Sequence, residues 1–297
     1  MLLDSFPSRE TFRDQAKTAN VIPVASRILA DMETPVSVLA RFQGHAESLF
    51  LFESVEGGER WGRYSFMGTQ AKVRVTVFRE DVVVRQGIQQ ERIPHHGKPM
   101  DVLRKIMAPY KLASFPGQPR FCGGLVGYFS YEMVHFFEPR IPNKLPGEKP
   151  LADLMIPETL LVFDNVQNTL TVMALSFVQS GEDLDQAYMA ATAKRDALLA
   201  RLSEPAHLSV QQGSQRDLTP KPIIPEQKFR DQVLKVKEHI VCGDIIQCVL
   251  SQSFVCEVPE DRLGLYRAQR HLNPSPYMYY LHLGNTELVG SSPETMI

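Results

Sequence analysis

The chain has 297 residues, of which 43% are hydrophobic and 22% charged, with a formal net charge of -2 at pH 7. These values are typical of a globular protein with a sizeable core, and the length allows two domains. There is no basic stripe, and no apolar run approaches the roughly 20 residues that span a bilayer, so neither a nucleic-acid partner nor a membrane location is expected. The first twenty residues contain no apolar signal core, which favours a cytoplasmic protein.

Elements of the first half are predicted from local patterns. A short helix is expected over 8–19, with Ser8 as its N-cap. β-branched and aromatic residues predict strands over 36–42, 48–54, 71–78 and 81–87. A helix is expected over 101–110, and residues 122–137 should change from strand to helix. The apolar runs 160–163 and 169–175 flank a polar turn and predict a hairpin.

The second half begins with a predicted helix over 182–202. Residues 204–225 are rich in Ser, Gln and Pro and are interpreted as a linker between a region 1–203 and a region 226–297. Pro225 should open a helix that stops at Gly243. A strand over 244–258, a helix over 261–271 and strands over 277–283 and 286–290 follow. Strands without a regular βαβ rhythm indicate an α+β fold with mostly antiparallel sheet.

The four cysteines do not form a metal motif. None belongs to a Cys-x-x-Cys pair, and no His stands beside them at zinc-like spacing. The interpretation is reduced thiols and no metal site in this chain. The cysteines are Cys122, Cys242, Cys248 and Cys256.

Four segments, taken in order, resemble anthranilate synthase component I across nearly the whole chain. They are LFLFESVEGGERWGRYSFMG at 49–68, GGLVGYFSYEMVHFFE at 123–138, GDIIQCVLSQSF at 243–254 and HLNPSPYMYYLHLGNTELVGSSPE at 271–294. The resemblance implies a two-lobed α+β fold in which large, mostly antiparallel sheets carry helices on the outside. It also implies a lyase of tryptophan biosynthesis that forms anthranilate and pyruvate from chorismate and ammonia with Mg²⁺. The implied partners are a glutamine amidotransferase subunit that supplies the ammonia and L-tryptophan as feedback inhibitor.

The same resemblance implies a tryptophan effector site built from two segments. Leu51-Phe52-Glu53-Ser54 matches the family's Leu-Leu-Glu-Ser, with Phe in place of the second Leu. The second segment is 273–278, Asn-Pro-Ser-Pro-Tyr-Met. On residue type alone, the first segment is the end of a strand, and the second is a turn stiffened by two prolines. The two segments are expected to meet in space. The effector residues implied are Phe52, Glu53, Ser54, Asn273, Pro274, Pro276, Tyr277 and Met278.

Gln247 is the candidate catalytic residue implied by the resemblance. A lysine that activates water stands at the matching position of related isochorismate synthases, and a neutral Gln cannot act as that base. Gln247 therefore fits an enzyme that uses ammonia. The family's Mg²⁺ ligands and its substrate-carboxylate Arg are expected beyond residue 297, so this chain alone is expected to make no anthranilate. No role is assigned to Glu294.

Two other functions remain open from the sequence. Aminodeoxychorismate synthase component I is a related enzyme that carries a lysine just beyond the position of Ile297, where anthranilate synthase carries an alanine. A non-catalytic, tryptophan-binding regulatory module would share both effector segments, and only an activity measurement would distinguish it.

Overall fold

The computed structural model of the chain describes residues 1–54, 62–119, 121–138, 140–141, 147, 149–206, 218–257 and 261–295. The chain divides into two compact units. The larger contains Met1–Leu208 and Leu263–Ile297, and the smaller contains Ser209–Arg262.

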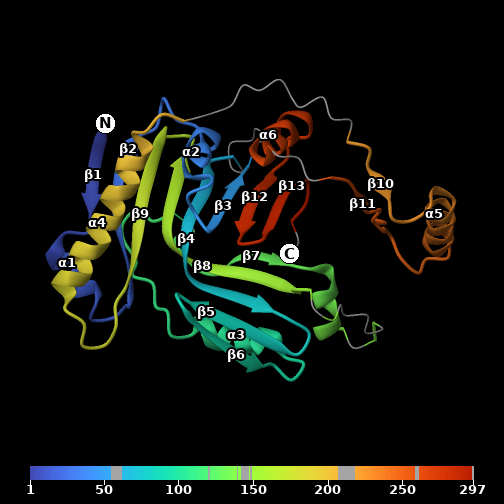
Figure 1. Cartoon of the computed structure of the whole chain (residues 1–297), viewed down its shortest axis with the longest axis horizontal. Coiled ribbons are helices and arrows are strands. Elements are labelled where there is room, and N and C mark those ends of the chain that lie inside the picture. Colours follow the sequence, from blue (N-terminus) through green and yellow to red (C-terminus); the bar gives the residue numbers. More distant parts are fainter. Residues whose placement is uncertain are drawn as a thin grey trace. The chain divides into compact units, whose positions relative to one another are not determined.

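The larger unit is built on one antiparallel sheet (Figure 1). Its main path runs in the order β1-β2-β9-β8-β4-β3-β12-β13, with β5 and β6 continuing from β4 and β7 pairing with β8. The strands are β1 (Leu2–Phe6), β2 (Val21–Leu29), β3 (Ser48–Glu53), β4 (Tyr64–Val77), β5 (Asp81–Gln86), β6 (Gln89–Pro94), β7 (Val126–Phe129), β8 (Ala152–Asp164), β9 (Thr169–Phe177), β12 (Tyr277–Leu283) and β13 (Thr286–Ser292). The predicted α+β class, with a large antiparallel sheet and helices outside it, is confirmed.

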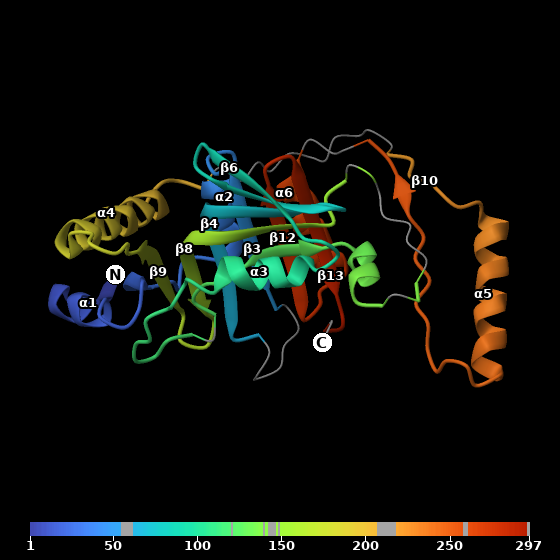
Figure 2. The same ribbon diagram turned by 90° about the horizontal axis from the view of Figure 1, so that it is seen from below.

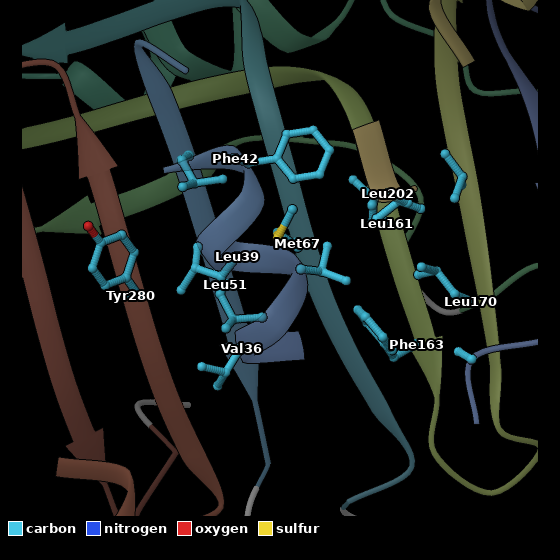
Figure 3. Close-up of a cluster of buried hydrophobic side chains, with 14 of the residues drawn as sticks. Val36, Leu39, Phe42, Leu51, Met67, Leu161, Phe163, Leu170, Leu202 and Tyr280 are labelled. Atoms are coloured by element: carbon cyan, nitrogen blue, oxygen red, sulfur yellow. The ribbon is translucent and has the colours of Figure 1, made fainter. Parts of the chain in front are cut away.

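Helices cover both faces of this sheet (Figure 2). On one face, α2 (Pro35–Phe42), the end of α4 (Leu184–Leu202) and α6 (Arg262–Leu272) pack on the central strands. Figure 3 shows Val36, Leu39 and Phe42 of α2 beside Leu51 and Met67 of the sheet. On the other face, α3 (Pro99–Met107) and the 3-10 helix η1 (Tyr131–Phe136) pack on β4 and β8. Further along the sheet, α1 (Arg9–Gln15) packs against α4.

Residues 36–42 are helical, so the predicted strand is wrong. Thr34 and Ser37 form a capping box: each side-chain hydroxyl accepts a hydrogen bond from the other residue's backbone N–H at 3.0 Å. Pro35 occupies the first turn, where its missing N–H costs nothing. The spacing of the buried residues Val36, Leu39 and Phe42 suits one helical face. Cap and packing together outweigh the weak strand preference of the valines.

The smaller unit contains α5 (Glu226–Val241) and a two-stranded pairing of β10 (Lys221–Pro222) with β11 (Phe254–Val255). The predicted strand over 244–258 is wrong for most of its length, because within the described residues 244–257 only β11 forms a strand. Position 258 lies outside the described residues. A strand is stable only where a neighbour accepts its backbone hydrogen bonds, and within the described part of this unit β10 offers two residues.

The predicted single region 226–297 is also divided. Residues 263–297 belong to the larger unit, because β12 pairs with β3 over six residues. Local sequence patterns do not reveal such a pairing, because the partner strands are more than 220 residues apart in the chain. The first region and the last two strands therefore share one hydrophobic core.

Candidate functional site

The two segments expected to form an effector site end on neighbouring strands. β12 pairs with β3 so that Met278 lies opposite Glu53 and Tyr279 lies opposite Phe52. β3 ends at Glu53 and β12 begins at Tyr277, so Ser54 and the turn before β12 lie at the same end of this strand pair. The strand pairing agrees with the expected meeting of the two segments; a shared pocket and tryptophan binding there stay predictions.

The turn before β12 is held by its own hydrogen bonds. The buried Ser275 hydroxyl accepts a hydrogen bond from the backbone N–H of Tyr277 at 3.3 Å. The backbone carbonyl of Asn273 accepts a hydrogen bond from the Ser291 hydroxyl of β13 at 2.7 Å. Asn273 and Pro274 are exposed, whereas Pro276 is half-buried. A turn fixed in this way loses little conformational entropy when a ligand binds.

The predicted effector residues divide between the two faces of the sheet. Phe52 packs into the hydrophobic cluster that includes Phe50 and Tyr279. Met278 packs into the cluster under α2 and α6, and the Glu53 side chain points the same way, because it contacts Tyr266 of α6. A ligand beside the Phe52 ring is therefore out of reach of the side chains of Glu53 and Met278. These two residues can contact it only through their backbone atoms.

Ser54 carries a buried hydroxyl. Its Oγ atom is buried and has no hydrogen-bond partner among the described residues. A buried polar atom without a partner costs about 1–3 kcal/mol. An added donor, such as the ammonium group of an amino acid, would remove that cost. Ser54 is thus the predicted residue whose local geometry points most directly to a ligand.

Glu53 is held by two residues that the sequence reasoning missed. The Tyr266 hydroxyl donates a hydrogen bond to Glu53 Oε2 at 2.5 Å, and Arg270 Nη2 donates to Oε1 at 3.3 Å. Arg270 Nε also lies 3.3 Å from Oε2, but without hydrogen-bond geometry, so the ion pair is loose. Burial, reinforced by the negative charge of Glu53, raises the pKa of Tyr266 far above its usual range, so the phenol stays a donor. The only sequence signal was the helical spacing that places Tyr266 and Arg270 on one face of α6.

Gln247 lies in the smaller unit, in an irregular segment after α5, and it is exposed. Its predicted role in catalysis stays a prediction.

In the part of the chain that the structure describes, no cluster of three or more His, Cys, Asp or Glu side chains could hold a metal ion. No chemical step is therefore assigned to a metal here. The four cysteines are free thiols, as expected. None of the described helices is long and apolar enough to cross a membrane.

Comparison with known proteins gives consistent matches. Anthranilate synthase component 1 from Acetivibrio thermocellus is 35% identical over 98% of this chain and 60% of its own length. The protein of the same name from Pseudomonas aeruginosa is 34% identical with the same coverage. The crystal structure of anthranilate synthase component I from Streptococcus pneumoniae superposes with a TM-score of 0.61 at 26% identity, covering 90% of this chain and 57% of that one.

These matches confirm the resemblance to anthranilate synthase component I. The chain spans about 60% of the length of the curated relatives it matches. The family model for chorismate binding enzymes matches residues 51–297, which is most of the chain. The chain therefore belongs to the family of chorismate-binding enzymes.

Proposed function

We propose that this chain works as part of an anthranilate synthase component I and carries its tryptophan effector site. The proposed reaction converts chorismate and ammonia to anthranilate and pyruvate in the cytoplasm, as a step of tryptophan biosynthesis. The ammonia would come from a glutamine amidotransferase subunit, component II, and the reaction would use Mg²⁺. The similarity to curated anthranilate synthases supports the reaction.

One observation carries the effector site. The pairing of β3 with β12 brings Ser54 beside the turn 273–276, and the Ser54 hydroxyl is buried without a partner among the described residues. A tryptophan site needs an apolar slot for the indole ring and a few fixed polar groups for the amino-acid end. Phe52, Pro276 and Tyr277 would supply the slot. Ser54 would accept a hydrogen bond from the ammonium group.

Calorimetric titration of the chain with L-tryptophan tests this site. We expect saturable binding to the unmodified chain. Ser54→Ala should weaken it by about 0.5–1.5 kcal/mol because one hydrogen bond is lost, and by more if the ammonium group is left buried and unpaired. That loss corresponds to a roughly two- to twelve-fold rise in Kd.

Two controls sharpen this experiment. Ser130 also carries a buried hydroxyl without a partner among the described residues, but it lies at the start of η1, so Ser130→Ala should leave the Kd unchanged. 3-Indolepropionic acid lacks the ammonium group and should bind weakly and equally to the unmodified chain and to Ser54→Ala. Absence of tryptophan binding to the folded, unmodified chain would refute the effector site.

The proposed role of Gln247 has its own test, in an active protein that contains this sequence. Gln247→Lys should admit water as nucleophile and produce some isochorismate-type product, because a lysine can serve as base. One general base contributes about 10²–10⁴-fold, so the new product should be detectable but minor. Chromatographic analysis of the products measures it. Anthranilate alone, at an unchanged rate, would remove Gln247 from the active site.

A further inference from the structure

The Glu53 carboxylate is buried at the edge of the proposed effector site without contacting the ligand's face of the sheet. Its side chain is 2% exposed, and burying a charge so completely is costly unless partners compensate. Among the described residues, its side-chain partners are Tyr266 and Arg270, both on α6. A carboxylate in this position, one residue before Ser54, needs a reason other than simple packing.

The contacts of Glu53 with Tyr266 and Arg270 complete a closed ring of covalent and non-covalent links, which runs from β3 through α6, the turn 273–276 and β12 back to β3. Glu53 ends β3, and its carboxylate binds α6 one helical turn apart, at Tyr266 and at Arg270. α6 runs directly through the turn 273–276 into β12, and β12 returns to β3 where Met278 lies opposite Glu53. The ring thus fixes the distance between the end of β3 and the turn, which are the two halves of the proposed site.

Most of this ring is deeply buried. Tyr266 is fully buried, and its ring packs edge-on against the ring of Tyr280, which also belongs to β12, with centroids 6.0 Å apart. Met278 is 1% exposed in the same cluster. Arg270, by contrast, keeps 39% of its side chain exposed. The ring therefore has a fixed inner member and an outer member that can be changed without opening the core.

We propose that Tyr266 and Arg270 are positioning residues of the effector site: through Glu53 they hold Ser54 and the turn 273–276 at the separation that L-tryptophan requires. The inference rests on the proposed effector function and adds residues on α6 to it. Glu53 connects these two residues to the end of β3 and does not itself contact the ligand through its side chain. Loss of either partner leaves the strand end free to shift, and the ammonium of the ligand then meets Ser54 in poor geometry.

The test is calorimetric titration with L-tryptophan of Tyr266→Phe, Arg270→Gln and Arg270→Lys. Mutations that act on a site through intermediate contacts can change affinity by roughly two- to thirty-fold, and we expect Tyr266→Phe and Arg270→Gln to fall in this range. Arg270→Lys keeps the positive charge and should recover part of the affinity. Tyr188→Phe is the matched control, because its hydroxyl donates to the carbonyl of Pro7, far along the sheet from β3.

A double-mutant cycle separates positioning from general loosening of the structure. If Tyr266 acts by aligning Ser54, then Ser54→Ala combined with Tyr266→Phe should weaken binding little more than the stronger single variant. Additive losses, or unchanged affinity in folded Tyr266→Phe and Arg270→Gln, would overturn the proposal while leaving the effector site intact. If Tyr266→Phe does not fold, the double-mutant cycle is measured with Arg270→Gln, because Arg270 is more exposed. Failure of the unmodified chain to bind would instead refute the effector function itself.

Discussion

Gly127→Ala is expected to destabilise the larger unit by about 3 kcal/mol, the upper end of the usual cost of forcing extra atoms into a packed site. Gly127 lies in β7 opposite Leu154 of β8. A Cβ atom at this position would lie 2.0 Å from the backbone carbonyl oxygen of Asp153 and 2.8 Å from the Cα atom of Leu154. Backbone atoms cannot rotate away as a side-chain end can, so β7 must separate from β8.

Urea denaturation followed by circular dichroism measures this loss. Gly147→Ala is the control, because a Cβ there meets no atom of the described residues within 4 Å. It should change the free energy of unfolding by less than about 0.5 kcal/mol. If Gly127→Ala proves no more destabilising than Gly147→Ala, the close approach of β7 to β8 is not a stabilising feature.

The elements that could be predicted from the sequence are those whose stability is local. The hairpin of β8 and β9 has apolar runs on both sides of a polar turn, and Asn168 in that turn adopts a positive φ of 51°, which asparagine tolerates well. α1 begins where its N-cap was expected, and the Ser8 hydroxyl accepts a hydrogen bond from the Thr11 N–H. In each case one short stretch of residues contains the whole signal.

The failures concern residues whose structure depends on distant partners or on competing local signals. For 36–42, strand-forming valines competed with a capping box, and the outcome depended on the face that packs on β3 and β4. For 244–258, the composition is typical of a strand, but only two of the described residues pair with a neighbouring strand. The division of 226–297 depended on β12 joining β3, which no local pattern specifies.

The candidate site shows the same limit. Phe52, Ser54 and Tyr277 came from family motifs, and their proximity came only from the strand pairing. Tyr266 and Arg270 have helical spacing that predicts a shared face. That spacing does not show which strand this face packs on, or that the face contacts the buried carboxylate of Glu53. The division of Glu53 and Phe52 between opposite faces follows from the two-residue period of a strand, once β3 is known to be covered on both sides.

The second large effect is expected at Phe50, a fully buried residue of β3 that lies between Gly68 of β4 and Leu281 of β12. Phe50→Ala should cost about 3–5 kcal/mol, because it removes the transfer free energy of a phenyl ring and leaves a cavity. The ring also supports its neighbour: the centroids of Phe50 and Phe52 are 5.1 Å apart. The loss should therefore reach the apolar side of the proposed effector site.

Gly68 gives this prediction an internal check. A Cβ atom at Gly68 would lie 2.2 Å from Cε1 of the Phe50 ring, so Gly68→Ala alone should be destabilising through overpacking. In the Phe50→Ala variant the same methyl group would enter the vacated space and fill part of the cavity. The double variant should therefore be more stable in urea than the sum of the two single losses predicts, by an interaction energy of about 0.5–3 kcal/mol. Strict additivity would show that the Phe50 ring does not occupy the space over Gly68, and that β3 is held against β4 by other contacts.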